Sequence, residues 1–85
     1  MQLGEVVGYA TATMKHPSLN GWKMLLVQLL DVNDGPDGEP VLCLDSLGAG
    51  RGDRVIASND GATVQALVGT RATPARWFVA GIRDA

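Results

Sequence analysis

Residues 41–58 read VLCLDSLGAGRGDRVIAS, two short apolar runs on either side of a glycine-rich loop. The runs at 41–45 and 54–58 have the length and apolar character of buried strands. The repeated glycines between them allow positive φ angles or the close approach of another backbone. A nucleotide-binding loop is disfavoured, because a strand follows instead of a helix and the glycine spacing is GxGxG rather than GxGxxG.

Strand-like runs and turns alternate along the rest of the chain. Residues 2–13 alternate bulky with small side chains, with Leu3 and Tyr9 on the bulky face, which favours a strand bent into a barrel. Residues 22–31 are aliphatic on both faces, as in a central strand, and residues 76–82 alternate as a closing strand. Only residues 62–68 have helical spacing. Five strands and one short helix predict an all-β protein, a small closed or nearly closed barrel.

The size of the chain predicts one domain, spanning residues 1–85 and 8.9 kDa. A chain of this mass buries only about 63% of its unfolded surface, so it is marginally stable alone. Cys43 is its single cysteine and His16 its single histidine, which leaves no internal disulfide and no Cys- or His-cluster metal site. We therefore expect oligomerisation to supply the missing stability.

The charge of the chain limits its partners. Seven basic and nine acidic residues give a formal net charge of −2, so there is no broad positive field for nucleic acid or for an anionic membrane. No window approaches the about 18 apolar residues of a membrane span. The first residues also lack the basic and apolar regions of a signal peptide. We expect a cytosolic protein with no nucleic-acid partner and no membrane partner.

No constellation of residues predicts catalysis, and none predicts a cofactor or a metal. Cys43 lies in an apolar run with no base nearby, so we expect a buried small side chain rather than a nucleophile. His16 precedes a proline in a polar loop and is expected to be solvated. The acidic segment 31–39 lacks the calcium-loop pattern and is expected to form a solvated turn.

The four aromatic side chains leave two alternatives open. They could stack nucleic-acid bases on a barrel surface. In a chain this small they are more often anchors of a core or an interface. These residues are Tyr9, Trp22, Trp77 and Phe78.

Three segments carry a family resemblance: residues 4–28 (GEVVGYATATMKHPSLNGWKMLLVQ), 45–55 (DSLGAGRGDRV) and 81–84 (GIRD). In order and spacing they resemble the opening, the D-x-x-G-A-G-x-G-[ED]-x-V signature and the closing G-I-V-D of the EutN/CcmL family. These are the pentameric vertex proteins of bacterial microcompartments, including carboxysomes. The resemblance covers nearly the whole chain, and Arg83 replaces the usual apolar residue before the final aspartate.

The resemblance implies a five-stranded, OB-like β-barrel that assembles as a cyclic homo-pentamer. The implied function is structural, without catalysis or a cofactor: the pentamer meets hexameric shell proteins and caps the vertices of a microcompartment in the bacterial cytoplasm. The alternative is an OB-type module that binds single-stranded nucleic acid or a small ligand. Such a module needs a basic groove with interleaved aromatics, which a net charge of −2 and 5% aromatic residues do not favour.

Within the implied pentamer, the glycine-rich loop is expected to form a contact between copies or to border the axial opening, because repeated glycines let backbones approach. Its arginine would then recur around one axis and favour small anions. The alternative is an arginine solvated at the rim. The loop residues are Gly48, Ala49, Gly50, Arg51 and Gly52.

Overall fold

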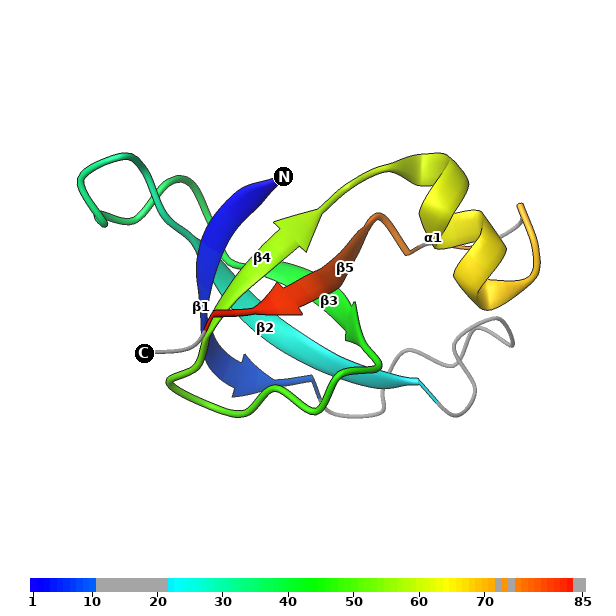
Figure 1. Cartoon of the computed structure of the whole chain (residues 1–85), viewed down its shortest axis with the longest axis horizontal. Helices are drawn as coiled ribbons and strands as arrows, with labels where there is room; N and C mark the ends of the chain where they lie inside the picture. Colours follow the sequence, from blue (N-terminus) through cyan, green and yellow to red (C-terminus); the bar gives the residue numbers. More distant parts are fainter. Residues whose placement is uncertain (11–21, 72, 74, 84–85) are drawn as a thin grey trace.

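The structure is a computed structural model that describes residues 1–10, 22–71, 73 and 75–83 (Figure 1). Five strands and one helix follow one another along the chain: β1 (Gln2–Tyr9), β2 (Lys23–Leu29), β3 (Val41–Asp45), β4 (Arg54–Ser58), α1 (Gly61–Val68) and β5 (Trp77–Ile82). The predicted inventory of strands and helix is confirmed. The predicted loop around His16 lies outside the described residues.

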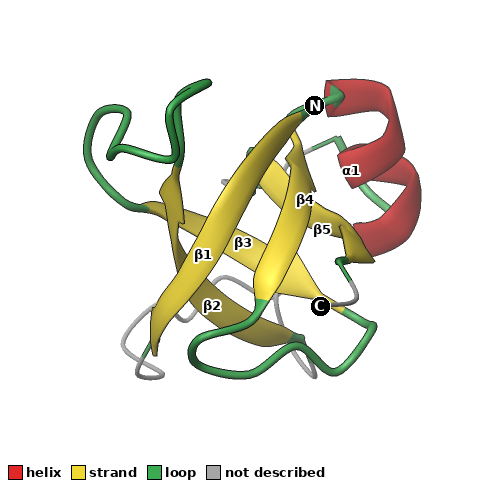
Figure 2. Cartoon of the chain, turned by 60° about the vertical axis from the view of Figure 1, so that its left-hand side comes forward, coloured by secondary structure: helices red, strands yellow, loops and turns green. Residues whose placement is uncertain are grey.

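The strands close into a barrel in the order β1-β2-β3-β5-β4 (Figure 2). Neighbouring strands are antiparallel, except that β3 and β5 run parallel. β5, the strand that follows α1 in the sequence, lies between β3 and β4 and runs antiparallel to β4 and parallel to β3. Every strand has a neighbour on both sides, although β3 and β5 pair at only two positions, so most strand edges are covered.

Glycine at position 4 allows β1 and β2 to approach closely. A Cβ added to Gly4 would lie 2.5 Å from the Cγ1 of Val27 and 3.1 Å from the carbonyl oxygen of Gln28. Burial alternates along β1 as predicted, with Gly4, Val6 and Gly8 buried, and a bulge between Val6 and Gly8 shifts the register against β2. A bulge of this kind bends a strand and redirects the side chains beyond it.

Tyr9 was predicted to share the bulky face with Leu3, and it is 49% exposed although it lies in register with Leu25 of β2, a fully buried core residue. Its hydroxyl reaches the loop between β3 and β4, where it accepts a hydrogen bond from the N–H of Arg51 at 3.2 Å.

The barrel interior is filled by side chains from every strand. This inner core comprises Val6, Leu25, Val27, Leu29, Cys43, Ala49, Val55, Ala57 and Val79. Cys43 is fully buried, as predicted. In β2 only one face is fully buried, and Met24 and Leu26 on the other face are half-buried. Each fully buried aliphatic side chain contributes about 1.5–3 kcal/mol, so this core dominates the stability of the chain.

A second cluster lies outside the barrel, next to α1. Its buried members are Leu44, Val64 and Ala75, and the half-buried residues packed on it include Trp22 and Phe78. The helix ends at Gly69, which has a φ of 79° and donates its N–H to the carbonyl of Gln65. Two of the four aromatic side chains therefore act as core anchors, and Trp77 packs against the inner core.

We expect Gly4→Ala to lower the free energy of unfolding by about 1–3 kcal/mol, because the new methyl group overpacks the contact between β1 and β2. Gly61→Ala is the matched control. A Cβ there meets nothing within 4 Å, and alanine restricts the unfolded chain, so stability should rise by up to about 1 kcal/mol. Urea unfolding at one fixed chain concentration measures both. Equal effects of the two substitutions would contradict the close approach of β1 and β2.

Candidate functional site: the loop between β3 and β4

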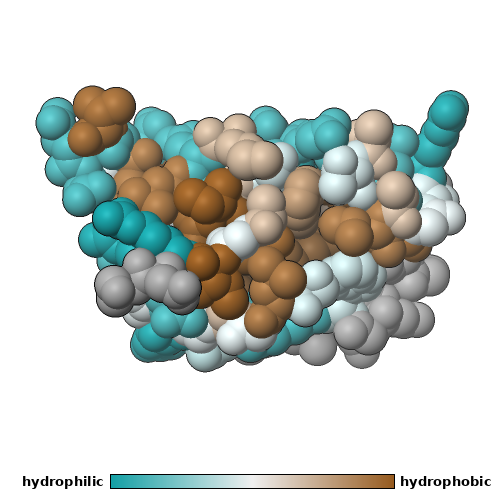
Figure 3. Space-filling model, in the orientation of Figure 1, coloured by the Kyte–Doolittle hydropathy of each residue, from teal (hydrophilic) through white to brown (hydrophobic). Residues whose placement is uncertain are grey.

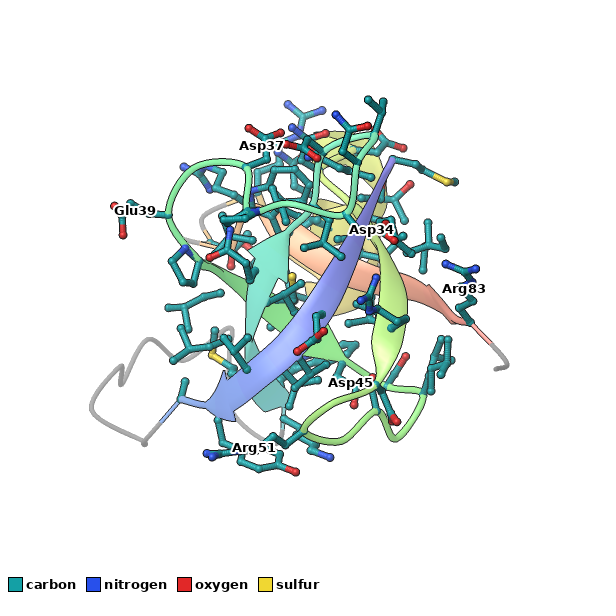
Figure 4. The ribbon with its side chains drawn as sticks, turned by 90° about the vertical axis from the view of Figure 1, so that its left-hand side faces the viewer. Asp34, Asp37, Glu39, Asp45, Arg51 and Arg83 are labelled. Atoms are coloured by element: carbon teal, nitrogen blue, oxygen red, sulfur yellow. The ribbon has the colours of Figure 1, made fainter. Side chains whose placement is uncertain are left out.

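The glycine-rich loop, residues 46–53, joins the end of β3 to the start of β4. Figure 4 shows Arg51 of this loop at one end of the molecule, while Asp34, Asp37 and Glu39 gather at the opposite end. The glycine-rich loop and the acidic turn therefore lie at different ends of the barrel.

The carboxylate of Asp45, the last residue of β3, organises the loop from inside. Its side chain has no solvent exposure. Oδ1 accepts a hydrogen bond from the N–H of Leu47 at 2.9 Å, and Oδ2 accepts from Gly48 at 3.2 Å and Ala49 at 2.9 Å. The Nζ of Lys23 lies 3.9 Å from Oδ2 and donates to the carbonyl of Ala49 at 2.9 Å. A buried charge is costly unless it is paired and hydrogen-bonded, and here one ammonium and three backbone donors satisfy it.

Alternating glycines give the loop its shape. Gly48 and Gly52 have φ angles of 88° and 89°, a region that glycine enters at no steric cost. Ala49 between them is fully buried and joins the inner core. Gly50 donates its N–H to Oδ2 of Asp53 at 2.8 Å. The expectation that these glycines supply positive φ angles is confirmed at two positions.

The far side of the loop is hydrogen-bonded to β1. The N–H of Val6 donates to the carbonyl of Asp53 at 3.0 Å, and the N–H of Gly52 donates to the carbonyl of Val6 at 2.9 Å. The N–H of Arg51 also donates a hydrogen bond to the hydroxyl of Tyr9 on β1. The loop is held by Asp45 on one side and by β1 on the other. The loop is therefore a rigid platform.

Arg51 stands out from this platform. Its side chain is exposed, and within the described residues no carboxylate lies within ion-pairing distance of its guanidinium. By contrast, Arg54 on β4 pairs with Glu5 at 3.3 Å and with Asp34 at 3.7 Å. Arg51 is thus a fixed positive group that remains available to a partner or an anion.

Of the other residues singled out from the sequence, two have clear positions. Burial raises the pKa of the Cys43 thiol to about 12, with a further contribution from the charge of Asp45, so the thiol stays protonated and unreactive near neutral pH. In the acidic turn, Asp31 accepts hydrogen bonds from the N–H groups of Asn33 and Gly35.

The described residues contain no group of three or more metal-ligating side chains close enough to hold an ion. Nor does the described part of the chain contain a helix long and apolar enough to cross a membrane.

Sequence reasoning quoted Asp45 and Tyr9 without assigning them these roles, and it missed Lys23. A signal for Asp45 was present: an aspartate directly before a turn often accepts hydrogen bonds from the next few backbone N–H groups. The roles of Tyr9 and Lys23 depend on contacts with distant parts of the chain, so local sequence carries no sign of them.

The outer wall of the barrel exposes apolar side chains (Figure 3). On neighbouring strands, Leu3 of β1 lies opposite Ile56 of β4, and Ala80 is the bulged residue of β5 next to Ile56. Leu3 and Ile56 are half-buried and Ala80 is exposed. We call these three residues the outer strip. Figure 3 shows apolar atoms gathered over β1, β4 and β5 on this face.

These features define a class of protein: a small closed barrel with a rigid end loop and an apolar outer wall suited to contact with other proteins. The family model described as "Ethanolamine utilisation protein EutN/carboxysome" matches residues 1–84. The chain belongs to this family, EutN/CcmL, as its sequence motifs predicted.

Individual relatives agree with the family match. The chain is 32% identical to the bacterial microcompartment shell vertex protein EutN of Salmonella typhimurium, over 99% of this chain and 84% of the relative. It is 34% identical to the carboxysome shell vertex protein CcmL of Gloeobacter violaceus, over 99% of this chain and 83% of the relative. A solved structure described as the GrpN pentameric microcompartment shell protein from Rhodospirillum rubrum has a TM-score of 0.80 and 36% identity, and the match covers 100% of this chain and 94% of that one. These relatives favour a shell-vertex protein over an OB-type binding module.

We expect Asp45→Asn to lower the free energy of unfolding by about 1.5–3 kcal/mol, since the amide nitrogen faces backbone donors and the hydrogen bonds to a charged acceptor are lost. Asp53→Asn is the control, because the hydrogen bond from Gly50 to Asp53 is exposed, and its loss should cost less than about 1 kcal/mol. Thermal unfolding followed by circular dichroism compares the two. If Asp53→Asn lowers the free energy of unfolding as much as Asp45→Asn does, burial of the Asp45 carboxylate is not the cause of the destabilisation.

Proposed function

We propose that five copies of this chain form a cyclic pentamer that caps the vertices of a bacterial microcompartment shell. Family membership over residues 1–84 and the pentameric state of the GrpN relative support this proposal. The single observation that carries it is the apolar outer wall of a closed barrel. Copies that associate through this wall in a head-to-tail contact form a ring when the rotation between them divides the circle.

The proposed role is geometric. Hexagonal tiles alone form flat sheets, and a closed polyhedron needs pentagonal units at its vertices. The partners of the pentamer would accordingly be hexameric shell proteins within a microcompartment in the bacterial cytoplasm. The role requires no catalysis and no nucleic acid. Two observations support a purely structural function: the relatives are named as shell vertex proteins, and the thiol of Cys43 is unreactive.

We further propose that the platform of Gly48, Ala49, Gly50, Arg51 and Gly52 meets a neighbouring copy or borders the axial opening of the ring. The exposed guanidinium of Arg51 supports this proposal, since five copies would form a ring of positive charge. The rigidity of the platform also supports it, because Asp45 and β1 hold the loop in one conformation. A fixed loop can present its arginine at the same place in every copy.

Native mass spectrometry tests the assembly. Five copies of the 8.9 kDa chain predict a species of about 45 kDa. A stable monomer, or a ring of another size, would contradict the pentamer. In cells, deletion of the protein should give elongated or open shells, and normal closed shells would contradict the vertex role even if the pentamer exists.

Arg51→Ala tests the platform. If Arg51 lines the axial opening, passage of small anions through reconstituted shells should fall severalfold while the pentamer persists, because the positive ring is lost. If the platform is a contact between copies, the variant should instead raise the chain concentration at which the pentamer dissociates. Arg71→Ala, on an exposed arginine after α1, is the control. An Arg51 variant that resembles this control in both assays would show that Arg51 is simply solvated.

A further inference from the structure

A second apolar surface lies away from the outer strip. β3 and β5 pair at only two positions, Cys43 with Trp77 and Leu44 with Phe78. A groove of about 320 Å³ opens beside this short seam. Its apolar lining includes Met24, Leu42, Leu44, Ala75 and Trp77, and we call these residues the groove.

The one charged side chain that lines the groove is already engaged within the chain. The Nη1 of Arg76 donates to the carbonyl of Thr73 at 2.8 Å and to the carbonyl of Ala75 at 2.9 Å. These bonds hold the guanidinium against its own backbone. The groove is therefore suited to an apolar occupant rather than to an anion.

The edges of the two surfaces carry opposite charges. Exposed Glu39 lies two residues before Val41, which borders the groove. Exposed Arg83 follows β5, and its N–H donates to the carbonyl of Arg54 on β4, the strand that carries Ile56. Figure 4 shows Glu39 on one side of the barrel and Arg83 on the other. Within the described residues, neither side chain has an ion-pair partner.

We propose, on the basis of the pentamer proposed above, that the outer strip of one copy packs into the groove of the next. Arg83 of the first copy then lies near Glu39 of the second. The two surfaces consist of different residues, so each copy uses each surface once. Such a heterologous contact closes into a ring when its rotation divides the circle. The apolar strip supplies the buried contact, and the charged edges set its register.

Two substitutions block the two surfaces separately. Ala80→Asp places a charge in the outer strip at an exposed position, and Leu42→Asp places one in the groove. Each variant alone should be monomeric by native mass spectrometry, since a single lost surface removes every contact in the ring. An equimolar mixture should give a dimer and no pentamer, because the intact groove of one variant accepts the intact strip of the other.

Val32→Asp is the matched control. Val32 is 98% exposed in the turn between β2 and β3 and belongs to neither surface, so this variant should remain pentameric. If the wild type is pentameric and either blocking variant is too, or if the mixture gives no dimer, this assignment of surfaces is wrong. If the wild type itself is monomeric, the proposed pentamer fails as well.

Charge reversal provides a second test that does not depend on the folding of Leu42→Asp. Glu39→Arg or Arg83→Glu alone should raise the chain concentration at half-dissociation about twofold to fivefold at low salt, as for an exposed ion pair. The double variant should return toward the wild-type value, since the pair is restored with opposite polarity. Additive effects of the two reversals would show that these side chains do not meet across the contact.

Discussion

The buried carboxylate of Asp45 is the interaction on which one end of this barrel depends. It accepts hydrogen bonds from three backbone N–H groups of the loop that follows it, and it lies beside one lysine ammonium. Because such a charge is tolerated in the interior only when its partners are in place, the loop has one conformation. That conformation puts Ala49 into the inner core and carries Gly52 to β1. The barrel end, the position of Arg51 and the loop's contact with β1 all follow from this arrangement.

Closure of the barrel explains how so small a chain can be a building unit. An open sheet would associate through its free edges without a defined limit. Here most strand edges are paired, and copies can associate through patches of side chains on the outer wall. The second cluster next to α1 shares Leu44 and Ala75 with the groove and does not include the outer strip. Contact between two different patches gives a closed ring only when its rotation divides the circle, and an open filament otherwise.

Sequence reasoning found each element because each has a local signal. Period-2 alternation identified the first and last strands, and short apolar runs identified the three between them. The spacing of residues 62–68 identified the helix, and the glycines at 48 and 52 identified backbone with positive φ. The bulge between Val6 and Gly8 of β1, which shifts the register against β2, was not predicted. Nothing in the local pattern marks it, because a bulge is defined by the pairing of two strands that are distant in sequence.

The sequence by itself determined the strand and helix inventory, the buried thiol and, through three motifs, the family. These depend on residue types and spacings within short segments. Only the tertiary structure decided the strand order, the roles of Asp45 and Lys23, and the two apolar surfaces of the outer wall. The physical reason is that each of these joins groups far apart in the chain, as when Arg51 donates to Tyr9, 42 residues away. Such contacts exist only after the barrel has closed.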